Sequence, residues 1–245
     1  MDPTIRVAEL GAGRGPAWLA ESFRLFRGAP LQWIALCAGW LAISLGLLLV
    51  PFLGLVVSNL LQPVFFASFA IAAYRQASGE RLVMRDLFRG FRRNMRALVN
   101  LGALLLLAQL VILMLMAALG MPMVEEGDHI LTVEEYVELL QGKEWILGIG
   151  LGLTVLVKGA LWFAPPLIAF HGMSTTHAVR WSVYAAFANL GAMLAYGAVL
   201  LVLFVAGMLP WALGLVVVLP LAAISTYVGY HEVFEATPAP DATPP

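Results

Sequence analysis

Long apolar runs separated by short polar segments dominate the pattern of this sequence. Residues 31–74 and 183–230 are almost continuously apolar, and each run is about twice the roughly 20 residues that a helix needs to cross a membrane. Pro51 and Gly54 divide the first run, and Pro210 divides the second. The pattern predicts an all-α, polytopic membrane protein with about six transmembrane helices in three hairpins, near 31–50, 52–74, 98–121, 145–170, 183–208 and 211–230.

The composition also indicates a lipid environment. Hydrophobic residues make up 61% of the 245 residues and charged residues only 12%, whereas soluble domains are about 45–50% apolar and ~25% charged. A water-soluble fold of this length could not bury so much apolar surface. We expect residues 1–235 to form a single helical membrane domain without a cleavable signal peptide, followed by a disordered tail at 236–245.

Basic and acidic residues are divided between two loops. The segment 75–96 carries seven arginines against Glu80 and Asp86, whereas 122–144 carries seven acidic residues and one lysine. Cytoplasmic loops of membrane proteins are rich in Lys and Arg. We therefore predict that 75–96 lies inside the cell, that 122–144 lies outside, and that the N-terminus and the C-terminus are both cytoplasmic.

Short motifs recur in the predicted hairpins. The sequence Leu-Phe-Arg-Gly occurs at 25–28 and again at 87–90, and the segment 50–57 around Pro51 has a counterpart at 209–216. Proline recurs in the even-numbered spans, at Pro63, Pro165, Pro166 and Pro220. The pattern indicates three copies of one unit, a cytoplasmic surface helix followed by two spans, with chance similarity of apolar sequences as the alternative. Many transporters contain such repeats.

Amphipathic segments precede the first and third spans. At about 100° per residue, the arginines of 81–98 occupy one arc of a helix and its large apolar residues an adjoining arc. The segment 17–27 places Trp18, Leu19, Phe23 and Phe26 opposite its charged residues. Such helices lie in the membrane interface, with apolar side chains in the acyl boundary and guanidinium groups at phosphates.

We predict that these segments contact lipid headgroups or a protein partner, with anchoring of the topology alone as the alternative. The predicted contact residues are Arg24, Arg27, Arg81, Arg85, Arg89, Arg92, Arg93 and Arg96.

Lys158 lies near the middle of the fourth predicted span, too far from either end for its side chain to reach the interface. Ionisable residues at this depth are functional candidates, so anion contact or gating is one hypothesis. The alternative is a lysine satisfied by its neighbours, for which the polar span residues are Asn59, Gln62, Gln109, Thr154 and Asn189. Gly148 and Gly152, at GxxxG spacing, predict close helix packing in the same span.

The remaining motifs predict local structure instead of chemistry. Thr132 and Glu135 form a capping box for a short helix in the acidic loop, which Gly142 ends. His171 and His177 have no carboxylate in the adjacent sequence to orient them as a relay, so we interpret this segment as a helix cap formed by Ser174, Thr175 or Thr176.

Motifs for catalysis, metals or cofactors do not occur. The sequence has no HExxH, Walker or CxxC pattern, and its one cysteine, Cys37, lies in an apolar run. We therefore predict no catalytic residue, no metal and no cofactor.

Three motifs resemble a known family. They occupy 18–33 (Trp-x4-Phe-Arg-Leu-Phe-Arg-x2-Pro-x2-Trp), 86–92 (Asp-Leu-Phe-x-Gly-Phe-Arg) and 230–234 (Tyr-x2-Val-Phe). They resemble uncharacterised six-span inner-membrane proteins of Gram-negative bacteria, whose hairpin plan is similar to that of YciC-type proteins and of the membrane domain of some glycerophosphodiester phosphodiesterases. The family pattern ends Tyr-Arg-x-Val-Phe, and here His231 replaces the arginine. The resemblance implies a bacterial inner (cytoplasmic) membrane location and no established catalytic residues.

The leading hypothesis is a non-enzymatic inner-membrane protein that contacts lipids or other proteins through its arginine-bearing helices. Its expected partners are membrane lipids with anionic headgroups, and no nucleic acid. The rival is a small-molecule transporter or channel that uses Lys158 and the proline-broken spans. An intramembrane enzyme comes third, because no acid–base or nucleophile pair is found. A water-accessible cavity ending at Lys158 would favour transport, and a filled bundle would favour the leading hypothesis.

Overall fold

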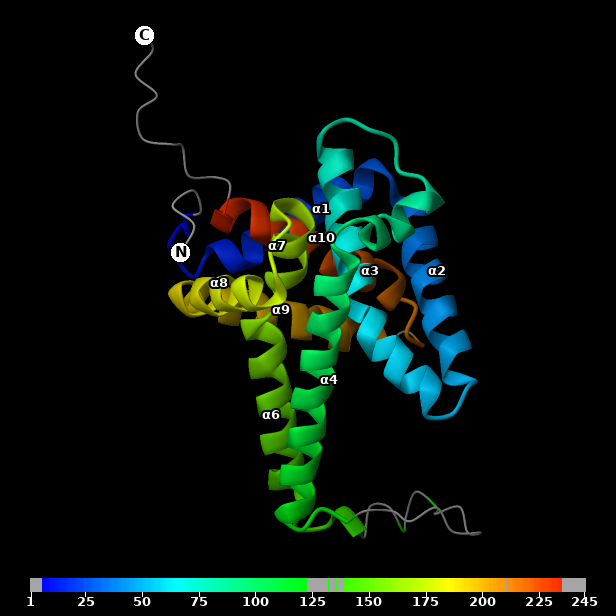
Figure 1. Cartoon of the computed structure of the whole chain (residues 1–245), viewed down its shortest axis with the longest axis vertical. Coiled ribbons are helices and arrows are strands. Elements are labelled where there is room, and N and C mark those ends of the chain that lie inside the picture. The colour runs from blue at the N-terminus through cyan, green and yellow to red at the C-terminus, as the bar shows by residue number, and fades with distance from the viewer. Residues whose placement is uncertain (1–5, 123–131, 133–134, 136–138, 210, 235–245) are drawn as a thin grey trace.

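The structure is a computed structural model that describes residues 6–122, 132, 135, 139–209 and 211–234. Within these residues it is helical and contains no strand. The chain starts with α1 (Arg14–Gly28) and the hairpin of α2 (Pro30–Leu48) and α3 (Leu53–Ala77). Two 3₁₀ turns, η1 (Met84–Phe88) and η2 (Gly90–Arg92), lead into α4 (Met95–Ala118). The remaining helices are α6 (Glu144–Ala160), α7 (Ala164–His171), α8 (Thr175–Ala188), α9 (Leu190–Met208) and α10 (Leu215–Phe234) (Figure 1).

Six helical segments are long and apolar enough to cross a membrane: Pro30–Leu48, Leu53–Ala77, Met95–Ala118, Glu144–His171, Leu190–Met208 and Leu215–Phe234. The first three agree with the predicted spans to within three residues at each end. The predicted class, an all-α polytopic membrane protein, is confirmed.

The fourth predicted span, 145–170, is found as the segment Glu144–His171, but this segment is not one continuous helix, and the fifth predicted span, 183–208, starts too early. The fourth is divided between α6 and α7, where Pro165 and Pro166 lie in the first turn of α7, the position at which a missing N–H is tolerated. The Ser182 hydroxyl bridges the break, donating to the Ala160 carbonyl at 2.8 Å and accepting from the Phe163 N–H at 3.1 Å. The predicted fifth span includes the end of α8, and α9 begins only at Leu190.

The turns of the first and third hairpins have the same construction. Phe52 and Trp211 both have positive φ values, 58° and 53°. Gly54 lies too close to Leu47 to allow a side chain, and Gly214 lies too close to Gly207. In both hairpins the glycine packs on the residue seven positions earlier, which supports the internal repeat for these two units.

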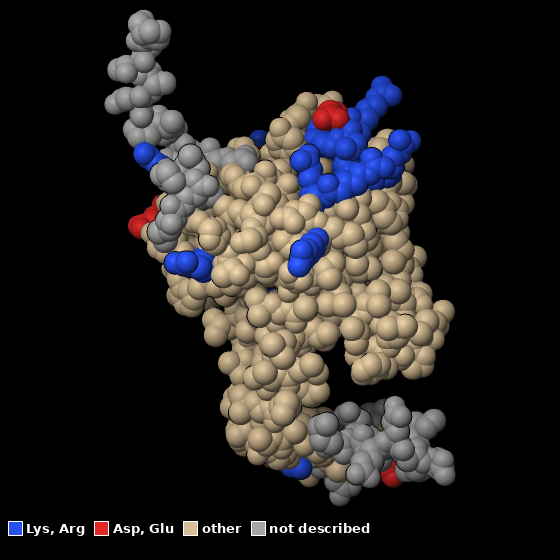
Figure 2. Space-filling model, in the orientation of Figure 1, with Lys and Arg blue, Asp and Glu red and all other residues tan. Residues whose placement is uncertain are grey.

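The hairpin of α4 and α6 projects beyond the other helices (Figures 1 and 2). Gly102, in the N-terminal half of α4, packs on the backbone of Leu60 in α3. The predicted close packing at Gly148 and Gly152 is wrong, because a Cβ added to either glycine meets no described atom within 4 Å. Gly150 packs on Met116 of α4 instead, so the helix contact uses another face of α6.

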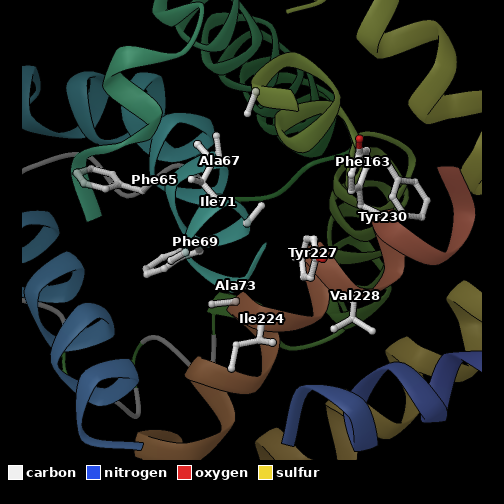
Figure 3. Close-up of a cluster of buried hydrophobic side chains, with 14 of the residues drawn as sticks. Phe65, Ala67, Phe69, Ile71, Ala73, Phe163, Ile224, Tyr227, Val228 and Tyr230 are labelled. Carbon is white, nitrogen blue, oxygen red and sulfur yellow. The ribbon is translucent and has the colours of Figure 1, made fainter. Parts of the chain in front are cut away.

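Helices α3 and α10 form the centre of the molecule. In their apolar windows 50% and 67% of residues are buried, compared with 17% in each of the other four spans. Ala73 of α3 lies beside Ile224 and Tyr227 of α10 (Figure 3). Helix α1 packs on α9 and α10, so it covers this core at the C-terminal end of α10.

The predicted capping box in the acidic loop is confirmed. The Thr132 N–H donates to Glu135 Oε2 at 2.7 Å, and the Glu135 N–H donates to Thr132 Oγ1 at 3.3 Å. Gly142, the predicted stop, has a φ of 76°. Most of the acidic loop and the predicted disordered tail at 236–245 lie outside the described residues.

Candidate functional site

The predicted amphipathic helix over 81–98 is wrong, because two 3₁₀ turns occupy most of this segment before α4 begins. Gly90 lies against the backbone of Val64 in α3, where a side chain would not fit, and its N–H donates to Ser68 Oγ at 2.9 Å. Asn94 then adopts a left-handed conformation with φ 33°. Contact with α3 and this backbone reversal prevent a continuous helix.

A buried carboxylate holds the two turns in place. Asp86 is fully buried and forms ion pairs with Arg75 of α3 and with Arg89. Its second oxygen accepts a hydrogen bond from the Val83 N–H at 2.9 Å. Because the buried Asp86 carboxylate joins Arg75 of α3 to Arg89 and to the Val83 backbone, this network fixes the turns to the end of α3.

The other arginines of the segment point outward. We call the set Arg81, Arg85, Arg89, Arg92, Arg93 and Arg96 the arginine patch, and all of them except the half-exposed Arg89 are exposed. Large apolar side chains are also exposed between them, namely Val83, Met84, Phe88 and Met95. Figure 2 shows a gathering of basic side chains over one end of the molecule. Cationic and apolar groups side by side suit the boundary between headgroups and acyl chains.

Helix α1 is more deeply packed than predicted. Trp18 is fully buried, and its ring lies beside the tilted rings of Trp162 and Tyr196. Its Nε1 donates a hydrogen bond to Glu232 Oε2 at 2.7 Å. The predicted acyl-boundary role of this face is therefore wrong for Trp18, Leu19 and Phe26, which are buried in the core.

The polar side of α1 is exposed, as predicted. Arg24 pairs with Glu21 at 2.5 Å, and Arg27 lies 5.9 Å from the centre of the exposed Phe23 ring.

A cavity of about 780 Å³ lies between α1 and the C-terminal ends of α3 and α10. We call it the ion-pair cavity, because Arg14–Glu232 and Arg24–Glu21, both at 2.5 Å, lie on its walls. The hydrogen bond that Arg14 donates to Glu232 raises the pKa of Arg14 above its ordinary value. Sequence reasoning missed this site, since Arg14 and Glu232 are 218 positions apart and no motif joins them.

Lys158 lies on α6 among polar side chains from three helices. Its Nζ is 3.5 Å from Gln62 Oε1, and it lines one cavity of about 220 Å³ and another of about 20 Å³. The smaller cavity is also lined by Asn59, Gln62, Gln109 and Thr154, which the sequence predicts as neighbours. The fifth predicted neighbour, Asn189, is elsewhere and binds Leu10 and Ala8. Neither Lys158 nor any of these polar neighbours lines the ion-pair cavity.

The segment that contains His171 and His177 connects α7 and α8 to other helices. His171 Nε2 and the Tyr230 hydroxyl share a hydrogen bond of 2.7 Å. Ser174 is the residue before α8, but it makes no capping side-chain hydrogen bond within the described part of the chain. The Thr175 hydroxyl donates to the Ala97 carbonyl at 2.9 Å, so it ties α8 to α4. In the residues that the structure describes, no group of three or more His, Cys, Asp and Glu could hold a metal ion.

The helical architecture and the six apolar spans define a multi-pass membrane protein. Among curated proteins, the chain is similar to a "probable inner membrane protein" of Burkholderia thailandensis, with 26% identity over 202 residues that cover 79% of this chain and 74% of the relative. No family model matches the chain, and no solved structure matches it.

Proposed function

We propose that this chain is a non-enzymatic protein of the bacterial inner membrane that contacts anionic lipid headgroups through the arginine patch. The observation that carries the proposal is the exposure of arginines together with Val83, Met84 and Phe88 on turns fixed to α3. Apolar side chains at this position would enter the acyl boundary while the guanidinium groups meet phosphates.

The number of exposed arginines favours an electrostatic role. Each basic residue close to an anionic membrane surface contributes about 1 kcal/mol to binding. The buried ion pair of Asp86 with Arg75 holds the backbone of the turns that carry the patch, so less backbone entropy is lost when lipids bind. Arg24 and Arg27 of α1 add positive charge.

The inner-membrane location is supported by the similarity to the Burkholderia protein, and the cytoplasmic placement of the patch by the positive-inside rule. The resemblance to YciC-type proteins and to the phosphodiesterase membrane domain is part of the proposal and brings no catalytic residue with it.

Charge reversal of the patch tests the proposal. Arg81, Arg85, Arg92 and Arg93 are replaced by Glu, leaving Arg89 and its buried partner intact. The purified chain is exposed to mixed vesicles of anionic and zwitterionic lipid, and the lipids that remain bound are quantified by mass spectrometry. We expect the wild type to retain anionic lipid preferentially and the variant to lose that preference. The matched Arg→Lys variant should keep most of it, and unchanged selectivity after charge reversal would refute the proposal.

Transport is the second candidate, favoured by the polar groups gathered around Lys158. Proteoliposomes would be tested for flux of a panel of small labelled anions. Flux by the wild type that is lost in Lys158→Met would support an anion pathway. Absence of flux, or flux unchanged by the substitution, would exclude a transport role for Lys158 with these anions.

A further inference from the structure

The walls of the ion-pair cavity carry both positive and negative side chains, which form ion pairs with one another. Its walls carry two arginines and two glutamates, in the pairs Arg14–Glu232 and Arg24–Glu21. A ligand with a single charge would be attracted by one member of each pair and repelled by the other. A zwitterion with its charges a few bonds apart can instead satisfy both signs at once.

The most buried of the four charges is the carboxylate of Glu232. Its side chain is 18% exposed, whereas those of Glu21, Arg14 and Arg24 are 44%, 48% and 74% exposed. Buried Tyr227 lies near Glu232 on the inner wall, and the exposed Tyr74 ring is 6.1 Å from the Tyr227 ring. The most buried part of the cavity is therefore acidic and aromatic, which favours a cation. Arg24, the most exposed of the four charges, lies at the rim beside Glu21, where its guanidinium group favours a phosphate.

Glu232 retains the capacity to accept further hydrogen bonds. One oxygen accepts from Arg14 Nε and the other from Trp18 Nε1. A carboxylate has about four lone-pair sites, so each oxygen has a second one. A primary ammonium group can donate hydrogen bonds to these sites, and a trimethylammonium group cannot.

The location of the cavity points to a lipid as the source of the zwitterion. It lies at the C-terminal ends of two membrane spans, α3 and α10, and Leu25 and Val228 form apolar parts of its wall. Its volume of about 780 Å³ is within the range of about 300–1,000 Å³ that ligand sites occupy.

We infer that the ion-pair cavity binds the phosphoethanolamine headgroup of a phospholipid. The ammonium group, which is the tip of this headgroup, enters first and binds Glu232 beside Tyr227. The phosphate remains at the rim with Arg24, and the acyl chains stay outside in the membrane. Glu232 and Tyr227 lie outside the arginine patch, and Arg24 is the one residue that this site shares with the proposed contact with anionic lipid.

The experiment measures binding of three lipids that differ only in headgroup. Full-length protein carrying the Arg81, Arg85, Arg92 and Arg93→Glu substitutions is titrated with dioleoyl phosphatidylethanolamine, phosphatidylcholine and phosphatidylglycerol, and bound lipid is counted by native mass spectrometry. This background reverses four of the six charges of the arginine patch, so failure of the proposed function leaves this test intact. We expect phosphatidylethanolamine to bind about tenfold more tightly than the other two lipids, the effect of one charge-assisted hydrogen bond.

Two variants locate the binding in the cavity. Glu232→Gln and Arg24→Gln should each weaken phosphatidylethanolamine binding about tenfold. Arg24 is mostly exposed, so this variant keeps the test valid if Glu232→Gln fails to fold. Arg27→Gln, on the same helix but outside the lining of the cavity, is the matched control and should leave binding unchanged.

Two results would overturn the inference: equal binding of the three lipids, or unchanged phosphatidylethanolamine binding in Arg24→Gln. Competition by soluble phosphoethanolamine identifies the source of the zwitterion. It should compete at least tenfold less effectively than the lipid, and equal competition would contradict a lipid ligand.

Discussion

The two central helices differ from the four peripheral spans in what surrounds them. In α3 and α10 at least half of the apolar window is buried by protein, whereas in each of the others only 17% is. Lipid must therefore cover most of α2, α4, α6 and α9. The ends of the central pair also hold the two polar sites, because α3 carries Arg75, which fixes the arginine patch, and α10 carries Glu232 of the ion-pair cavity.

The burial of a helix predicts how strongly a substitution in it will affect the stability of the protein. Gln76 at the end of α3 accepts from Trp33 Nε1 and donates to the Leu25 carbonyl, both at 2.7 Å, so one polar side chain joins three helices. Among the described residues, Lys158 on peripheral α6 makes one hydrogen bond, a long one of 3.5 Å to Gln62 Oε1. We therefore expect large effects at short, buried contacts with α3 and small effects at long contacts and on the outer faces.

The largest effect is expected at Gly102. A leucine there would collide with the Leu60 backbone of α3, and overpacking of this kind destabilises by about 3 kcal/mol. Gly102→Leu should sharply reduce the yield of monodisperse protein in detergent and lower its melting temperature. Gly148→Leu is the matched control, since its site faces open space, and it should behave as the wild type. Equal losses in both variants would contradict the packing described.

Asp86→Asn is expected to have the next largest effect. It leaves Arg75 without one of its two ion-pair partners. Because Arg75 keeps its pair with Glu80, we expect a cost of about 2 kcal/mol, less than when the remaining charge is wholly unpaired. Thermal unfolding should show a clear loss of stability. Glu21→Gln, which breaks an exposed pair, should change stability by less than about 1 kcal/mol. If Asp86→Asn were as stable as Glu21→Gln, the network would not hold the turns.

Lys158→Met is expected to have the smallest effect on stability. The substitution removes a charge whose insertion at this depth costs roughly 2.5–3.5 kcal/mol, and it breaks one long hydrogen bond. The melting temperature should stay the same or rise. Arg75→Met, in the central α3, should lower it. A marked loss of stability in Lys158→Met would mean that the lysine supports the fold.

Much of the fold could be predicted from the sequence, because span length and turn residues are local properties. The bounds of α2, α3 and α4 follow from apolar length, and the first hairpin turn follows from Pro51 and Gly54. The polar neighbours of Lys158 could also be named, since few polar residues occur in the spans.

The errors arise where tertiary contacts override a periodic pattern. Residues 81–98 have helical periodicity, yet Gly90 packs on α3 and Asp86 is buried, so turns form instead. The GxxxG spacing of Gly148 and Gly152 says nothing about which face of α6 meets α4. The ion-pair cavity joins residues from the two ends of the chain, and no local signal could predict it.

Membrane orientation is the claim on which the lipid proposal most directly depends. In a Cys37→Ala background, Arg81→Cys and Gln141→Cys place single thiols in the arginine patch and at the far end of the α4–α6 hairpin, respectively. A membrane-impermeant maleimide is added to intact spheroplasts and, separately, to lysed ones. We predict that Gln141→Cys is labelled in both samples and Arg81→Cys only after lysis. Labelling of Arg81→Cys in intact spheroplasts, with Gln141→Cys protected, would contradict a cytoplasmic arginine patch.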